Sequence, residues 1–103
     1  MIARTWHGAT PQSEAVAYLD YLNKTGVPDL RATPGNRGVF VLRRIEAGLA
    51  HFLLISLWDS AESIRAFAGA DIEKARYYPE DARFLVELEP GVTHYDVMVN
   101  DQG

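Results

Sequence analysis

The sequence predicts an α+β fold of the ferredoxin-like type, in which six elements follow in the order β-α-β-β-α-β. Two stripes of apolar residues at helical spacing, within 15–22 and 61–67, indicate two helices. Segments typical of strands precede the first stripe, lie as a pair between the stripes, and follow the second. This order predicts two split βαβ units, with one antiparallel sheet and both helices on one of its faces.

Length and composition indicate one globular domain over residues 1–103. Hydrophobic residues make up 48% of the chain and charged residues 23%, which is ordinary for a folded protein. The formal charge of -4 argues against nucleic acid or an anionic membrane as a partner. The chain has no cysteine, its longest uncharged run covers only 47–58, and no export signal begins it, so we expect a cytoplasmic protein.

The first half of the chain predicts a strand, a helix and a long loop. Residues 2–7 are the expected strand, and Thr10 with Pro11 is expected to open the helix, as N-cap and first helical residue. Gly26 is expected to end this helix as a left-handed cap, and 27–37 is expected to be a loop. The apolar stripe of the helix contains Ala15, Tyr18, Leu19 and Leu22.

The middle of the chain predicts a hairpin followed by the second helix. Strands at 38–45 and 50–58 flank a turn at 46–48. Asp59 or Ser60 is expected to cap the helix, and Asp59 has the spacing of a capping box with Glu62. Ala61, Ile64 and Phe67 form the buried side of this helix, which Gly69 is expected to end.

The last third of the chain predicts short helical segments and a final strand. Residues 71–76 are expected to add a helical turn or two, and 79–81 to start one more short turn. The Pro-Gly pair at 90–91 breaks the chain before a strand at 92–99.

Both faces of the predicted sheet are apolar, although two helices can cover only one. One face of the strand 50–58 would present Phe52, Leu54, Ser56 and Trp58, and the other Leu53, Ile55 and Leu57. Tyr95, Val97 and Val99 would add a further apolar row. An antiparallel sheet with one wet face should alternate apolar and polar residues, so we predict a homodimer that buries the second faces against each other.

The sequence resembles the antibiotic biosynthesis monooxygenase (ABM) family in three motifs. These are the strand-to-helix junction that begins with LWDS at 57–60, the step GAD at 69–71, and the tail VTHYDV at 92–97. The resemblance implies a dimeric α+β barrel with a pocket between sheet and helices, and it implies monooxygenase activity.

The sequence can be compared with two branches of this family. The first branch contains oxygenases that oxidise phenolic rings with O₂ and no cofactor. Trp58 matches the tryptophan of their pocket. Leu54 stands where they have an asparagine, and Tyr78 stands where they have an arginine, with Arg76 close by. The resemblance implies an aromatic or planar apolar small molecule as substrate.

The second branch with which the sequence can be compared contains the small heme-degrading monooxygenases. Tyr77 falls at the position of their axial histidine, and Phe67 falls at the position of a tryptophan. Their asparagine in the first strand has no counterpart here. Because tyrosine can ligate ferric heme, a heme-binding relative is the alternative interpretation. A dimer that binds a small ligand without catalysis is a further one.

The candidate catalytic residues are His94 and His7 as proton acceptors and Trp58 as a positioning group. A neutral imidazole near a phenol could take its proton, the step that a cofactor-free oxygenase needs; the alternative for His94 is a structural, hydrogen-bonded role. His51 is expected to be exposed, and the three histidines lack metal-ligand spacing, so no metal site is predicted. The expected pocket residues are Leu54, Trp58, Ile64, Phe67, Arg76, Tyr77 and Tyr78.

Overall fold

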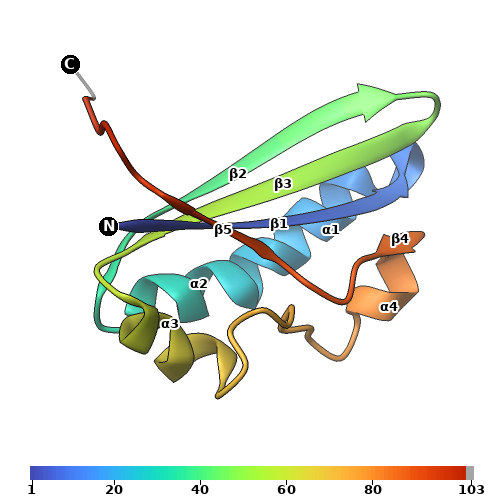
Figure 1. Cartoon of the computed structure of the whole chain (residues 1–103). Helices are drawn as coiled ribbons and strands as arrows, with labels where there is room; N and C mark the ends of the chain where they lie inside the picture. Colours follow the sequence, from blue (N-terminus) through green and yellow to red (C-terminus); the bar gives the residue numbers. More distant parts are fainter. Residues whose placement is uncertain (102–103) are drawn as a thin grey trace.

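The computed structural model describes residues 1–101 and has the predicted ferredoxin-like architecture. The strands form one antiparallel sheet in the order β2-β3-β1-β4, and β5 also pairs with β1. The helices lie on one face of this sheet (Figure 1). The elements are β1 (Ile2–Pro11), the 3₁₀ turn η1 (Gln12–Glu14), α1 (Ala15–Lys24), α2 (Gly26–Ala32), β2 (Asn36–Glu46), β3 (Leu49–Trp58), α3 (Ala61–Ala68), α4 (Asp81–Phe84), β4 (Glu87–Leu88) and β5 (Thr93–Asp96).

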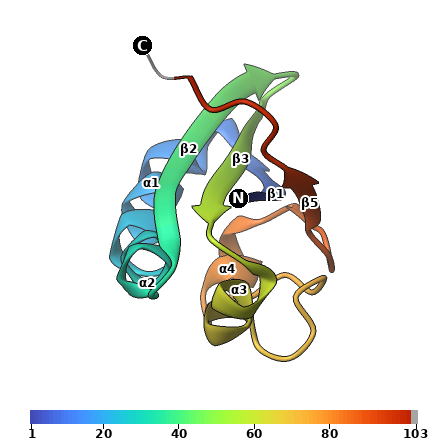
Figure 2. The ribbon, with the colours of Figure 1, turned by 60° about the vertical axis from the view of Figure 1, so that its left-hand side comes forward.

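The hairpin of β2 and β3 confirms the predicted strands and turn. Ala47 and Gly48 form the turn, both with positive φ, 52° and 78°. This left-handed pair gives the twist that a two-residue hairpin turn needs. Figure 2 shows α2 beside the start of β2, at the end of the hairpin away from the turn. The segment 69–80 joins α3 to α4, which lie at opposite ends of the molecule in Figure 1.

The first helix begins later than the sequence predicted. Pro11 is the last residue of β1 and pairs with Leu49, and the hydroxyl of Thr10 bonds to the Pro11 carbonyl instead of capping a helix. The 3₁₀ turn then leads into α1 at Ala15. The predicted stripe is confirmed in that Ala15, Tyr18 and Leu22 are buried, while Leu19 is half-buried.

The predictions of a glycine cap at Gly26 and of a loop over 27–37 are wrong for most of this segment. Gly26 opens α2, and Thr25 ends α1 with its hydroxyl donating to the carbonyl of Tyr21 at 2.7 Å. Pro28 is the third residue of α2, where an N–H has no partner within the helix, so proline is tolerated there. Burial of Leu30 anchors this short helix to the core.

The second helix begins at the predicted cap. The Ser60 side chain accepts a hydrogen bond from the backbone N–H of Ser63 at 3.2 Å, and Gly69 ends α3 with φ 94°. The capping box predicted for Asp59 and Glu62 is absent, because both Asp59 carboxylate oxygens accept from Arg37, at 2.7 and 2.9 Å.

The segment 71–76 forms no helix, in contrast to the prediction. Its carbonyl groups bond elsewhere: those of Ile72 and Lys74 accept from the guanidinium of Arg4, and that of Glu73 accepts from the N–H of Val92. These partners replace the bonds that a helix would make along its own axis. The short turn expected to start at 79–81 is α4.

The last strand is shorter than predicted and shares the edge of β1 with a strand that was not predicted. β5 pairs with residues 2–5 of β1, and β4 pairs with residues 8–9. The N–H of Val97 donates to the carbonyl of Met1, so β1 has no further residue against which 97–99 could pair.

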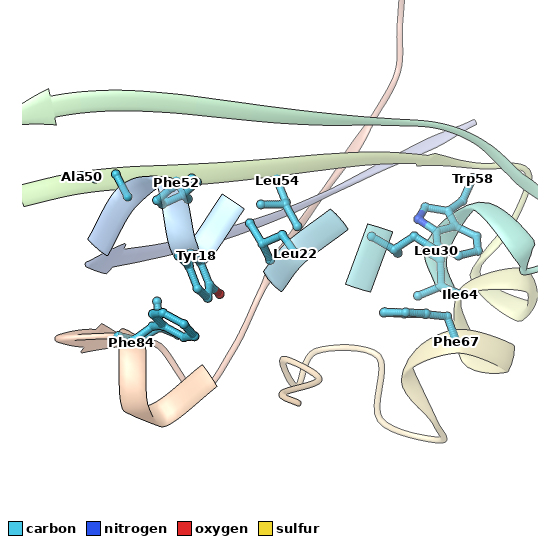
Figure 3. Close-up of a cluster of buried hydrophobic side chains, with 12 residues drawn as sticks. Tyr18, Leu22, Leu30, Ala50, Phe52, Leu54, Trp58, Ile64, Phe67 and Phe84 are labelled. Carbon is cyan, nitrogen blue, oxygen red and sulfur yellow. The ribbon is translucent and has the colours of Figure 1, made fainter. Parts of the chain in front are cut away.

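The core lies between the sheet and the helices. The helix-facing row of β3, which is Phe52, Leu54, Ser56 and Trp58, is buried as predicted. Figure 3 shows Tyr18, Phe52 and Phe84 at one end of this core and Leu30, Trp58, Ile64 and Phe67 at the other.

The opposite face of the sheet carries large apolar side chains that are exposed to solvent. Phe40, Leu42, Leu53 and Tyr95 are between 37% and 58% exposed, and Ile55 and Leu57 between them are half-buried. We call these six residues the open face. Within residues 1–101, no helix has the length and hydrophobicity needed to cross a membrane.

Candidate functional site

A cleft opens between the helices and the helix-facing side of the sheet. It holds about 520 Å³ of empty space with its mouth included, but the cavity itself is about 60 Å³, which suits a few water molecules. Its walls are mainly aromatic and aliphatic, with two arginines and one aspartate. The lining residues are Arg4, Trp6, Tyr18, Leu22, Gly26, Leu30, Leu54, Ser56, Phe67, Arg76, Tyr77, Tyr78, Asp81 and Val92.

Arg4 places a buried positive charge on the cleft wall. β1 turns this side chain toward the helices, and only 5% of the residue is exposed. Its guanidinium donates to the carbonyls of Ile72 at 2.9 Å and Lys74 at 3.0 Å. Among residues 1–101, no carboxylate lies within ion-pair distance of it, although Glu73 is near enough to interact electrostatically. Burial lowers the pKa of Arg4, but a guanidinium stays charged at neutral pH.

Arg76 provides a second cation at the exposed side of the cleft. Its guanidinium carbon lies 4.8 Å from the centre of the Phe67 ring and 5.0 Å from that of Tyr78, so it stacks between two aromatic faces. It also donates to the Phe67 carbonyl at 3.0 Å and approaches Asp29 at 3.5 Å. These contacts hold the charge beside the apolar wall.

Trp6 and Tyr77 form one aromatic wall. The indole N–H of Trp6 donates to the Tyr77 hydroxyl at 3.0 Å, and the two rings meet edge to face. The Tyr77 hydroxyl in turn donates to the backbone carbonyl of Glu89. Burial raises the pKa of Tyr77 above its usual value, more than the Trp6 hydrogen bond lowers it, so this side chain is a neutral phenol at pH 7.

Two further tyrosines are fixed by aspartates. Tyr18 donates to Asp81 at 2.9 Å, and Asp81 also accepts from the N–H of Tyr78 at 2.6 Å. The Tyr78 hydroxyl donates to Asp29 at 2.6 Å. Burial first, and the neighbouring carboxylates after it, raise the pKa of both phenols. The tyrosine hydroxyl groups of the cleft are therefore neutral, and each already donates its proton in a hydrogen bond within the protein.

Five of the pocket residues predicted from the sequence line this cleft, and two do not. The five are Leu54, Phe67, Arg76, Tyr77 and Tyr78. Trp58 and Ile64 are fully buried in the core behind it. The Trp58 indole N–H donates to Ser56 at 2.8 Å, so its polar atom is also turned inward.

Neither predicted proton acceptor lines the cleft. His94 pairs with Arg4 across β5 and β1 and therefore lies on the helix-facing side, next to the arginine. Its Nδ1 is 3.6 Å from Glu73, and neither ring nitrogen has a hydrogen-bond partner among the described residues. Burial, and then the charge of Arg4, lower the pKa of His94 and keep it neutral. His7 pairs with Leu53, so the sheet separates its side chain from the cleft.

The cleft residues that were not predicted from the sequence include Arg4, Trp6, Tyr18 and Asp81. The alternation of β1 carried the signal for two of them, because Arg4 and Trp6 share the face that β1 turns toward the helices. An arginine on the buried face of a strand is uncommon and indicates a site.

The comparisons with known proteins support the fold. No family model matches the chain, and no curated protein matches it. Several solved structures do, among them two of MhuD. A mutant of MhuD with two manganese protoporphyrin IX bound per active site has a TM-score of 0.62, with 17% identity over 100% of both chains. MhuD, a heme-degrader from Mycobacterium tuberculosis with two hemes bound in its active site, has a TM-score of 0.63, with 16% identity over 98% of this chain and 99% of that chain. At such identities the likeness establishes the fold alone.

Proposed function

We propose that this protein binds a planar aromatic molecule that carries an anionic group, with heme as the first candidate. The observation that carries the proposal is Arg4, a buried guanidinium with no carboxylate of residues 1–101 within ion-pair distance, on the wall of a cleft lined by aromatic rings. The likeness to MhuD, whose structure holds two hemes in its active site, supports the choice of heme.

The physical argument rests on charge and shape. A buried charge without an opposite charge is costly, and an anionic group of a ligand would offset that cost at Arg4. The rings of Trp6, Phe67 and Tyr77 offer flat apolar surfaces to a flat apolar ligand. Arg76, on the exposed side, could pair with a second anionic group.

The lining suits the ring and the carboxylates of heme. The porphyrin would lie against the aromatic wall, and its propionates would pair with Arg4 and Arg76. The phenolic oxygen of Tyr77 would hold the iron, because Tyr77 lines the cleft and falls at the position of the axial histidine in the heme-degrading branch that the sequence resembles. A bound heme would supply an iron centre able to activate O₂. The chain itself would orient the ring, neutralise its carboxylates and keep water from its apolar face.

A porphyrin needs more room than the cavity of about 60 Å³ provides, so binding requires the cleft to open further. The segment 69–80 carries Arg76, Tyr77 and Tyr78 between α3 and α4 without regular helix or strand of its own. We expect this segment to move outward when a ligand enters.

Titration with hemin tests the proposal. We expect a Soret band that shifts on binding and saturates, with a tighter affinity for the free acid of protoporphyrin IX than for its dimethyl ester. The Arg4→Gln variant should lose that preference, by roughly 10- to 100-fold, which is the usual strength of a hydrogen bond to a charged group.

Because Tyr77 is protonated at pH 7, iron binding must release its proton. Hemin affinity should therefore rise up to about tenfold per pH unit, and metal-free protoporphyrin should lack this dependence.

Tyr77→Phe should abolish the pH dependence and weaken hemin binding, while Tyr95→Phe, on the other face of the sheet, serves as the matched control. If hemin produces no spectral change, or if Arg4→Gln folds normally and binds hemin like the wild type, the heme proposal fails. Melting curves of each variant separate loss of binding from loss of the fold.

A second candidate function is oxygenation of a phenolic metabolite without a cofactor, which the aromatic lining of the cleft also suits. His94 would then act from beside Arg4, as a neutral group that helps to position this arginine. Oxygen uptake with a panel of phenols should detect the reaction, and His94→Gln should shift its pH profile. Uptake by no phenol, together with saturable hemin binding, would exclude this candidate; melting shifts without uptake would favour simple ligand binding.

The open face supports a homodimer as the functional form. Phe40, Leu42 and Leu53 are exposed together on adjacent strands, which is a larger apolar surface than a soluble monomer usually leaves in water. A second copy would cover it and leave the helical side of each chain free for its cleft.

A further inference from the structure

We propose that His7, His51 and Glu87 form a binding site for a divalent transition metal on the face of the sheet opposite the cleft, with Glu89 orienting His7. Their candidate ligand atoms all lie within 4.8 Å of one another. The spacing of the histidines in the sequence gave no indication of this cluster, because three separate strands and the loop after β4 assemble it.

The sheet register brings these side chains together. Ala9 of β1 pairs with His51 on one side and with Glu87 on the other, and His7 lies two residues earlier on the same face of β1. Because Ala9 is small, the two longer side chains that flank it can reach toward each other and toward His7. Ala9 is fully buried beneath them. The site is thus held by backbone pairing of β3, β1 and β4.

The hydrogen bonds of His7 leave one of its nitrogens ready to bind a metal. Its Nδ1 lies 2.9 Å from the Glu89 carboxylate, which only accepts, so Nδ1 carries the proton. Its Nε2 then points a lone pair at the Nδ1 of His51, 2.9 Å away. In metal sites a carboxylate commonly accepts a hydrogen bond from the outer nitrogen of a histidine while the inner nitrogen binds the metal.

The spacing suits a cation between these groups. Two imidazole nitrogens at 2.9 Å must share a proton or a metal ion. Ligand atoms about 2.0–2.1 Å from a tetrahedral zinc lie roughly 3.3 Å from each other. The observed separations bracket this value, at 2.9 Å between the histidines and 3.7 Å from His51 to Glu87. Small rotations of partly exposed side chains would bring the three into place.

The ligand set and surroundings define the class of metal. Two imidazoles and one carboxylate favour zinc, nickel or copper over magnesium and calcium, and leave a fourth position for water. The hollow beside the histidines is also lined by Arg43 and Arg44, whose charges oppose a cation; Arg44 is paired with Glu46. Glu87 and Glu89 supply the opposite charge. Glu87, on the edge strand β4, is about half exposed, so the site stays reachable from the side of the sheet.

Metal binding to the untagged full chain, after treatment with a chelator, tests the site. We expect zinc to bind with one ion per chain by calorimetry and to raise the melting temperature, and cobalt to give visible absorption bands of a low-symmetry site. His51→Ala and Glu87→Gln should remove the bands and the thermal shift, and Glu89→Gln should weaken binding roughly 10- to 100-fold. His94→Ala removes a histidine outside the cluster and should leave binding unchanged.

Other outcomes would overturn the metal site. If wild-type protein shows no saturable zinc binding, the histidine pair shares a proton only. If folded His51→Ala and folded Glu87→Gln both bind zinc as the wild type does, the ion sits elsewhere. Because the sheet separates this cluster from the cleft, hemin binding is measured independently of either result.

Discussion

Replacing Trp58 by alanine is expected to lower the free energy of unfolding by about 3–5 kcal/mol, the usual cost of removing a large buried aromatic side chain. Trp58 is fully buried at the end of β3, and its ring lies 6.1 Å from that of Phe67. The truncation would leave a cavity and also deprive Ser56 of the hydrogen bond from the indole. A loss of this size is a large part of the stability of a small domain.

Urea unfolding followed by circular dichroism measures this change. Trp58→Phe keeps most of the ring volume and should lose less, and Val16→Ala, at a position 78% exposed, should change the free energy of unfolding by less than about 0.5 kcal/mol. A Trp58→Ala protein that loses less than about 1 kcal/mol would contradict the packing described for this end of the core.

The second large effect is expected for the open face, where Leu53→Asp should convert a dimer into a monomer. Leu53 lies between Leu42 of β2 and His7 of β1, near the middle of the exposed apolar surface. A carboxylate in place of this apolar side chain must lose its hydration when the interface forms, which costs several kcal/mol, enough to weaken association by about a hundredfold or more. Light scattering should change from twice the chain mass of 11.5 kDa to that mass.

The matched control is Val16→Asp, which adds the same charge on the exposed side of α1 and should leave the dimer intact. Wild-type protein that scatters as an 11.5 kDa particle at high concentration would refute the dimer. Melting curves of Leu53→Asp would show whether the monomer keeps its fold.

Periodicity in the sequence was sufficient to predict the fold, because burial on one face leaves a regular pattern. The alternation along β3 gave its buried row, and the spacing of Ile64 and Phe67 gave α3. The helix α2 was missed because Gly26 and Pro28 usually interrupt helices, whereas both fall within its first turn, where no N–H has a partner inside the helix.

The candidate sites could be predicted only in part, since they depend on contacts between distant segments. Tyr77 and Arg76 were identified through a family resemblance, but the bonds from Arg4 to Ile72 and Lys74 join residues about seventy positions apart. These bonds also explain why 71–76 is not helical. The cluster around His7 depends on β4, a strand of two residues that leaves no periodic signal in the sequence.

The two edges of the sheet have a consequence for solubility. At one edge, the two short strands β4 and β5 pair with different parts of β1, so this edge offers no long continuous strand. The other edge is β2, whose pairing with β3 is irregular near Asn36 and Gly38 and which exposes Arg43 and Arg44. Irregular or charged borders discourage strands of other molecules from extending a sheet. We therefore expect concentrated solutions to resist fibril growth through these edges.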